Sequence, residues 1–97
     1  MTRLIFTHKS VSDLEAILRY IARDKPEAAV RFVDAIERQC NIFVDFPNLG
    51  MLREDLAAGL RLFSFRGYGI YYRNLHDEIR IERVLHGAMD VTPERFQ

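Results

Sequence analysis

Residues 10–46 read SVSDLEAILRYIARDKPEAAVRFVDAIERQCNIFVDF and carry the clearest structural pattern of the chain. Its apolar residues recur every three or four positions, which is the spacing of one face of an α-helix. Pro26 divides the stretch, because proline disfavours helical geometry in the residue before it and suits the first position of a following helix. We therefore predict two amphipathic helices that form an antiparallel hairpin.

Each predicted helix carries one apolar stripe. Ser12 is expected to cap the first helix in a capping box with Glu15, and Ser10 is the alternative cap. Cys40 lies within the second stripe, which favours a place in the core over a nucleophilic role. The stripes consist of Val11, Leu14, Ile17, Leu18 and Ile21 in the first helix, and of Ala29, Phe32, Ile36, Cys40 and Phe43 in the second.

The rest of the chain has the pattern of a sheet. Short apolar, aromatic or alternating runs predict strands at 3–7, 60–66, 68–73 and 78–86. Gly67 and residues 74–77 are expected to form the turns of a three-stranded antiparallel meander, which the first strand joins at its edge or beside its centre. With the hairpin on one sheet face, residues 1–97 form a single two-layer α+β domain with a short C-terminal tail.

The charge balance limits the classes of function. The chain has 14 basic and 14 acidic residues, and 12 of the 14 basic residues are Arg. A neutral chain is a poor non-specific polyanion binder, whereas Arg suits specific ion pairs at interfaces. A single cysteine, no long apolar span and no signal peptide indicate a cytoplasmic protein without a membrane anchor.

No cofactor or metal is expected. The three His have no ligand spacing, and the five Gly do not form a phosphate-binding loop. Tyr68, Tyr71 and Tyr72 are clustered and have the chemistry to stack on bases, but a strand tyrosine more often packs with its hydroxyl at the rim. Direct, specific nucleic-acid binding is therefore not expected.

Arg83 and His86, near the end of the last predicted strand, are candidate functional residues. By alternation, Arg83 points to the side of Ile79, Ile81 and Leu85, where an unpaired charge is expensive. It is expected either to form a structural ion pair with an acid, Asp90 or Glu82 in the first instance, or to contact an anion or a target. His86, at the exposed strand end, is either a surface residue or a general acid–base.

Together these segments resemble the ParE toxins of type II toxin–antitoxin modules, within the ParE/RelE superfamily. The resemblance covers residues 4–91 and runs through the helical hairpin to a terminal signature. Its motifs are Ser12-Asp13-Leu14-Glu15-Ala16-Ile17, Tyr20-Ile21-Ala22, Pro26-Glu27-Ala28-Ala29, Pro47-Asn48-Leu49-Gly50, Gly59-Leu60-Arg61, Ile70-Tyr71-Tyr72-Arg73 and Arg83-Val84-Leu85-His86-Gly87-Ala88-Met89-Asp90. The chain departs from the family at Met89, a position that is often Arg.

The resemblance implies a toxin that inhibits DNA gyrase and is held inactive by a ParD-like antitoxin, usually as a heterotetramer. RelE-type relatives instead cut ribosome-bound messenger RNA, and here Arg61, Arg83 and His86 would be the catalytic set. The neutral charge favours the non-enzymatic gyrase inhibitor, because a ribonuclease of this kind needs a basic surface for ribosomal RNA. A relative that has lost toxicity and only binds an antitoxin is the third possibility.

The expected contact residues fall into two groups. Candidates for the target contact and for toxicity are Arg83, His86, Met89 and Asp90. A disordered antitoxin segment is expected to fold into an apolar groove at the sheet and helix edges, pairing its acids with Arg. The residues expected to line that groove are Leu60, Arg61, Phe63, Tyr72 and Arg73.

Overall fold

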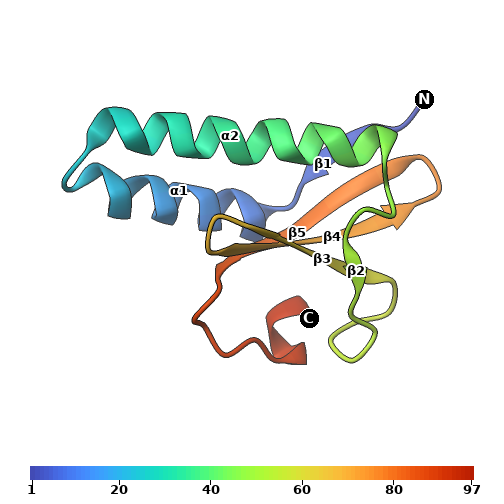
Figure 1. Cartoon of the computed structure of the whole chain (residues 1–97). Helices are drawn as coiled ribbons and strands as arrows, with labels where there is room; N and C mark the ends of the chain where they lie inside the picture. Colours follow the sequence, from blue (N-terminus) through green and yellow to red (C-terminus); the bar gives the residue numbers. More distant parts are fainter.

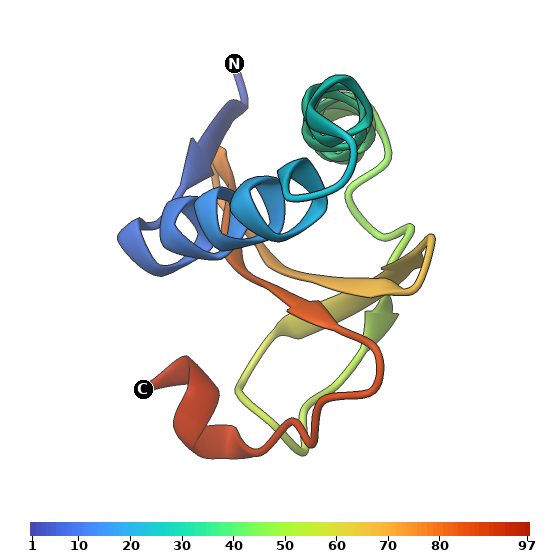
Figure 2. The same ribbon diagram turned by 90° about the vertical axis from the view of Figure 1, so that its left-hand side faces the viewer.

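The computed structural model describes all residues, 1–97, and shows a helical hairpin lying on one face of a twisted five-stranded sheet (Figure 1). The turned view shows that the sheet lies between the hairpin and the C-terminal tail (Figure 2). The predicted α+β architecture is confirmed. The elements are β1 (Arg3–Phe6), α1 (His8–Ala22), α2 (Pro26–Asp45), β2 (Met51–Leu52), β3 (Leu60–Phe65), β4 (Tyr68–Leu75), β5 (Glu78–His86) and a 3₁₀ turn, η1 (Pro93–Phe96).

Helix α1 begins earlier than the capping-box pattern predicted. Thr7 is its N-cap, and the Thr7 hydroxyl accepts a hydrogen bond from the Ser10 amide at 3.1 Å. The Ser10 hydroxyl donates in turn to the Thr7 carbonyl at 2.9 Å, and Ser10 is fully buried. Neither Ser10 nor Ser12 is therefore the cap, because the strand before the helix delivers a threonine to that position first. Helix α2 begins at Pro26, as predicted.

The sheet has the order β1-β5-β4-β3-β2. Strands β3, β4 and β5 form the predicted antiparallel meander, and β1 lies at the edge, parallel to β5. At the other edge β2 pairs antiparallel with β3, a strand that sequence patterning did not predict because two residues show no alternation. The β3–β4 turn consists of Arg66 and Gly67, which both have positive φ.

A β-bulge divides β5 into two parts. Tyr71 pairs with Arg83 while its neighbour Tyr72 pairs with Ile81, so Glu82 is the extra residue. Before the bulge, Ile81 faces the helices; after it, Leu85 faces the opposite side. The prediction that Arg83 shares a face with Ile79, Ile81 and Leu85 is thus wrong in part, because one added residue reverses the alternation.

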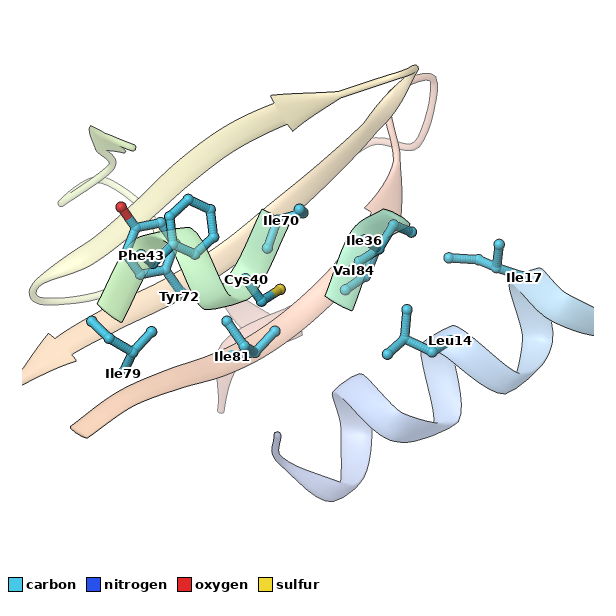
Figure 3. Close-up of a cluster of buried hydrophobic side chains, with 10 residues drawn as sticks. All are labelled: Leu14, Ile17, Ile36, Cys40, Phe43, Ile70, Tyr72, Ile79, Ile81 and Val84. Atoms are coloured by element: carbon cyan, nitrogen blue, oxygen red, sulfur yellow. The ribbon is translucent and has the colours of Figure 1, made fainter. Parts of the chain in front are cut away.

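The main core lies between the hairpin and the sheet (Figure 3). Phe43 of α2 stacks on Tyr72 of β4 with ring centroids 4.1 Å apart, and both side chains are fully buried. Ten buried residues make up this core: Leu14, Ile17, Ile36, Cys40, Phe43, Ile70, Tyr72, Ile79, Ile81 and Val84.

A second, smaller cluster covers part of the opposite sheet face. It consists of Leu56, Leu60, Tyr71 and Leu85, and Phe96 of η1 packs against it. The Phe96 ring lies 5.1 Å from that of Tyr71. The tail therefore closes over apolar surface that two layers alone would leave exposed.

Candidate functional site

The end of β5 is fixed to helix α1 by an ion pair. Arg83 donates Nε to Asp13 Oδ2 at 2.8 Å and Nη2 to Oδ1 at 2.7 Å, a bidentate pair of which each side chain is about one seventh exposed. The hydrogen bond to Asp13 raises the pKa of the Arg83 guanidinium, which therefore stays charged.

The same carboxylate completes the edge of the sheet. Strand β1 pairs with β5 only as far as Ile81, so the last part of β5 has no neighbouring strand on that side. Asp13 Oδ2 accepts the Val84 amide there at 3.0 Å, and Arg83 Nη1 donates to the carbonyl of Arg95 in the tail at 3.2 Å. The Asp13–Arg83 pair thus joins the helix, the strand and the tail.

The expected structural role of Arg83 is confirmed, but its partner is neither Asp90 nor Glu82. Glu82 instead lies 3.4 Å from Arg73. Asp13 is 70 positions away in the chain, and nothing in the sequence connects it with Arg83. Only the fold brings the two together.

His86 is exposed and held by its neighbours. Its Nδ1 accepts the Ala88 amide at 3.1 Å, and its ring packs edge-on against Tyr68 with centroids 5.1 Å apart. The next residue, Gly87, donates its amide to the Gly67 carbonyl at 2.7 Å. A Cβ at Gly87 would lie 2.8 Å from that oxygen, so the close approach requires glycine. The His86 segment is therefore bonded to the tip of the β3–β4 hairpin.

A cleft of about 490 Å³ opens between α1 and the end of the sheet. Tyr20, which is 68% exposed, forms one wall, and Met89, which is 39% exposed, stands at the rim. A second hollow of about 380 Å³ lies beside it and shares Tyr68, His86 and Met89. The first cleft is lined by Asp13, Ala16, Ile17, Tyr20, Tyr68, Arg83, Val84, Leu85, His86, Met89 and Arg95.

Two of the four expected target residues thus lie side by side on the ridge between these hollows, His86 and Met89. Arg83 lines the first cleft with its charge engaged by Asp13, and Asp90 is exposed beyond it. Sequence patterning did not connect Asp13 or Tyr20 with this place, because the fold alone brings α1 beside the end of β5. Of the local features, only Gly67 was expected to form a turn.

The structure does not assemble the three residues expected for ribonuclease chemistry. Arg61 is opposite Tyr72 in the β3–β4 register, on the helix side, whereas Arg83 is opposite Tyr71, on the other side. The Arg61 guanidinium donates to the Gly50 carbonyl at 2.7 Å. Arg61 and Arg83 therefore face away from each other. Arg83 and His86 both line the first cleft, but the Arg83 charge is paired with Asp13.

The predicted antitoxin groove needs correction. Leu60 and Tyr72 are fully buried, because both faces of this part of the sheet are covered. The Tyr72 hydroxyl donates to the Pro47 carbonyl at 2.9 Å and accepts the Gly50 amide at 2.7 Å. Neither residue is available to a partner.

The other three expected antitoxin residues do not line one groove. Phe63 is half-buried against Phe43 on the helix side, with ring centroids 5.5 Å apart, and Arg61 faces the same side. Arg73 lies on the opposite face beside Glu82. The candidates are thus divided between the two faces of the sheet.

Cys40 is a core residue. It is fully buried, and burial together with the nearby Glu37 charge raises the pKa of its thiol from 9.0 to about 12. A thiol of such a pKa is neutral near pH 7 and a poor nucleophile.

The structure holds no group of three or more His, Cys, Asp or Glu side chains arranged to bind a metal ion. Neither helix has the length and apolar content needed to cross a lipid bilayer.

Comparison with known proteins identifies the family of this chain. Residues 4–91 match the family described as ParE toxin of type II toxin-antitoxin system, parDE. Toxin ParE3 of Caulobacter vibrioides is 30% identical over 95 residues, which cover 97% of this chain and 95% of that toxin. A solved structure described as a chromosomal ParDE TA system from P. aeruginosa matches with a TM-score of 0.77 and 27% identity, over 89% of this chain and 96% of that one.

The chain is accordingly a toxin of the type II toxin–antitoxin class. Within that class it belongs to the ParE toxin family. The resemblance inferred from the sequence motifs is confirmed.

Proposed function

We propose that this toxin inhibits DNA gyrase without catalysing a reaction of its own, acts in the cytoplasm, and is neutralised by a ParD-like antitoxin in a heterotetramer. Membership of the ParE family carries the proposal. The target contact is the ridge of His86 and Met89 with the neighbouring Asp90 and the anchored Arg83.

The arrangement of charges supports a protein target over RNA cleavage. A phosphodiester-cleaving site needs a base, an acid and a stabiliser of the developing phosphorane charge within reach of one another. Arg61 and Arg83 lie on opposite sides of the sheet, and the Arg83 charge is paired with Asp13. The net charge of zero also disfavours docking on ribosomal RNA.

The antitoxin surface is proposed at the free edge of the sheet beside β2. Exposed apolar residues gather along this part of the chain, among them Phe46 at 63% and Met51 at 71% exposure. Arg61 and Phe63 lie on the neighbouring strand. A partner segment that adds a strand to β2 would cover this surface and satisfy the unpaired edge.

The direct test is a supercoiling assay with purified DNA gyrase and relaxed plasmid. We expect the wild-type toxin to block supercoiling or to trap cleaved plasmid, and to leave messenger RNA on translating ribosomes intact. Ribosome-dependent cleavage of a message would refute the proposed target. A folded protein that neither inhibits gyrase nor slows growth when expressed alone would instead identify a non-toxic antitoxin-binding relative.

The variant His86→Ala tests the absence of acid–base catalysis. We expect at most a severalfold loss of gyrase inhibition, because the ring contributes contact area and not proton transfer. Complete loss of toxicity with an unchanged melting temperature and intact antitoxin binding would support a catalytic histidine. His76→Ala is the matched control, since it removes the same side chain from an exposed position in the turn between β4 and β5, and it should inhibit gyrase as wild type does.

A further inference from the structure

The turn between β3 and β4 holds an unusual residue. Arg66 has φ of 50° and Gly67 has φ of 87°, so both central positions of this two-residue hairpin turn are left-handed. Asn or Asp followed by Gly is the usual pair in such a turn, because a residue with a longer side chain is disfavoured at positive φ. An arginine at this position is thus retained at the expense of stability.

The Arg66 side chain is held by an aromatic contact, and its charge is not paired with an acid. Its guanidinium carbon lies 5.0 Å from the centre of the Phe65 ring, in a cation–π contact. Phe65 packs on Phe32 of α2, with centroids 6.3 Å apart, so the ring is itself fixed. Arg66 is exposed and takes part in none of the ion pairs of the structure.

Arg66 immediately precedes Gly67, which lines the second hollow, and Tyr68, which lines both. The Gly67 carbonyl accepts the Gly87 amide, and Tyr68 packs against His86. The hairpin tip and the His86 segment are therefore in direct contact. Together they combine an exposed cation with an apolar hollow whose own acid, Asp13, is already paired.

We propose that Arg66 is a binding residue for an acidic segment of the protein on which the toxin acts. The guanidinium donates to a carboxylate of that segment, and an apolar side chain next to the carboxylate enters the cleft beneath Tyr20. The proposal rests on the proposed function in one respect, namely that this end of the molecule meets the target. The net charge of zero and the apolar lining favour a protein segment over nucleic acid.

The experiment separates binding from folding by means of Arg66→Asn. Asparagine favours the left-handed conformation and creates the Asn-Gly pair preferred in this turn, so we expect the melting temperature to rise by a few degrees. Target binding, measured as gyrase inhibition, should weaken by roughly 30-fold, the usual size for a central arginine anchor. Growth inhibition on induced expression should fall in parallel at an equal protein level.

Two further variants serve as controls. Arg38→Gln removes the same charge from an exposed position on α2, and we expect wild-type toxicity. Arg66→Lys keeps a charge at the tip without the planar fork, and we expect toxicity between those of wild type and Arg66→Asn.

Each other outcome has a definite meaning. Equal toxicity of Arg66→Asn and wild type overturns the proposal, as does a lower melting temperature accompanied by loss of toxicity. Binding of a short DNA duplex that Arg66→Asn abolishes also overturns it, because the ligand would then be nucleic acid. A wild-type chain that is folded but not toxic overturns the proposed function, and this inference with it.

Discussion

The two ends of the sheet are held together by different chemistry. At the end of the sheet that carries the β3–β4 hairpin tip, a bidentate Asp13–Arg83 pair holds β5 to α1, and a Gly87–Gly67 backbone bond holds the tip itself. At the β2 end, the Tyr72 hydroxyl holds the loop after α2, and its ring stacks in the core. The first arrangement is electrostatic and lies beside a cleft; the second is a buried polar contact behind an exposed apolar edge.

This difference indicates that the two ends suit different partners. The tip presents a fixed Arg66 cation and a cleft, which fit an acidic segment with one apolar anchor. The β2 end presents a short edge strand with Met51 exposed, which fits an added strand. The proposed target surface and the proposed antitoxin surface therefore lie at opposite ends of the sheet.

The largest loss of stability is expected from Asp13→Ala, which removes the pair at the tip. Arg83 and the Val84 amide both lose their acceptor, and breaking one side of a largely buried pair costs about 3 kcal/mol of unfolding free energy. Urea unfolding measures the difference. Glu15→Ala, at an exposed site on the same helix, should cost under about 0.5 kcal/mol. A loss below about 1 kcal/mol for Asp13→Ala would show that the tip does not depend on this pair.

A smaller loss is expected from Tyr72→Phe at the opposite end. The ring still stacks on Phe43, but the Pro47 carbonyl and the Gly50 amide lose their partner, which costs about 2 kcal/mol. Tyr20→Phe, at an exposed hydroxyl, is the control and should be neutral. Equal stability of Tyr72→Phe and wild type would mean that water replaces the hydroxyl and that this end is held by packing alone.

Alkaline pH should weaken the core that joins the two ends. The pKa of Cys40 is about 12 in the folded chain against 9.0 for an ordinary thiol. Below pH 9 the Cys40 thiol is protonated in both the folded and the unfolded chain, so its contribution to the free energy of unfolding is fully present. Between pH 9 and 12 unfolding releases the proton, and this contribution is progressively lost.

Unfolding followed from neutral to alkaline pH measures this slope. Burial also raises the pKa of Tyr68, Tyr71 and Tyr72, so the slope continues in the same direction above their ordinary value of 10.0. The variant Cys40→Ala isolates the thiol, because only the tyrosine part should remain. A stability that does not change from pH 9 upward in the wild type would contradict a buried, neutral Cys40.

The smallest effect on stability, with a large effect on binding, is expected from Met51→Lys. The side chain is 71% exposed, so unfolding free energy should change by less than about 0.5 kcal/mol. Affinity for the ParD-like antitoxin, measured by titration calorimetry, should fall by roughly tenfold or more. Val30→Lys, at a 54% exposed site on α2, should bind as wild type does. Unchanged affinity of Met51→Lys would move the antitoxin away from the β2 edge.

Local patterns predicted most of this fold. Helix α2 begins at Pro26 as expected, because proline acts on its immediate neighbours. The three meander strands follow from composition and from turn residues such as Gly67. Strand β2 and the Thr7 cap were missed, since the first is too short for a pattern and the second depends on where the preceding strand ends.

The candidate site was less predictable, because its contacts join distant parts of the chain. His86 and Met89, which lie close in sequence, both line the first cleft, and their role as target contacts stays a prediction. Asp13 was missed because its partner is 70 residues away. Leu60 and Tyr72 were wrongly expected at the surface, because a strand with apolar residues on both faces does not show which face is covered.

The bulge at Glu82 changes which residues of β5 face the helices. The second half of β5 is out of phase with the first by one residue. Odd-numbered residues such as Ile81 face the helices before the bulge, and even-numbered residues such as Val84 face them after it. If the full strand paired with β4 without the bulge, Glu82 would lie opposite Tyr71 and Arg83 opposite Ile70, so Arg83 and Val84 would exchange faces. The guanidinium would then point into the core, and the valine away from it. The Asp13–Arg83 ion pair therefore depends on the one extra residue that the bulge accommodates.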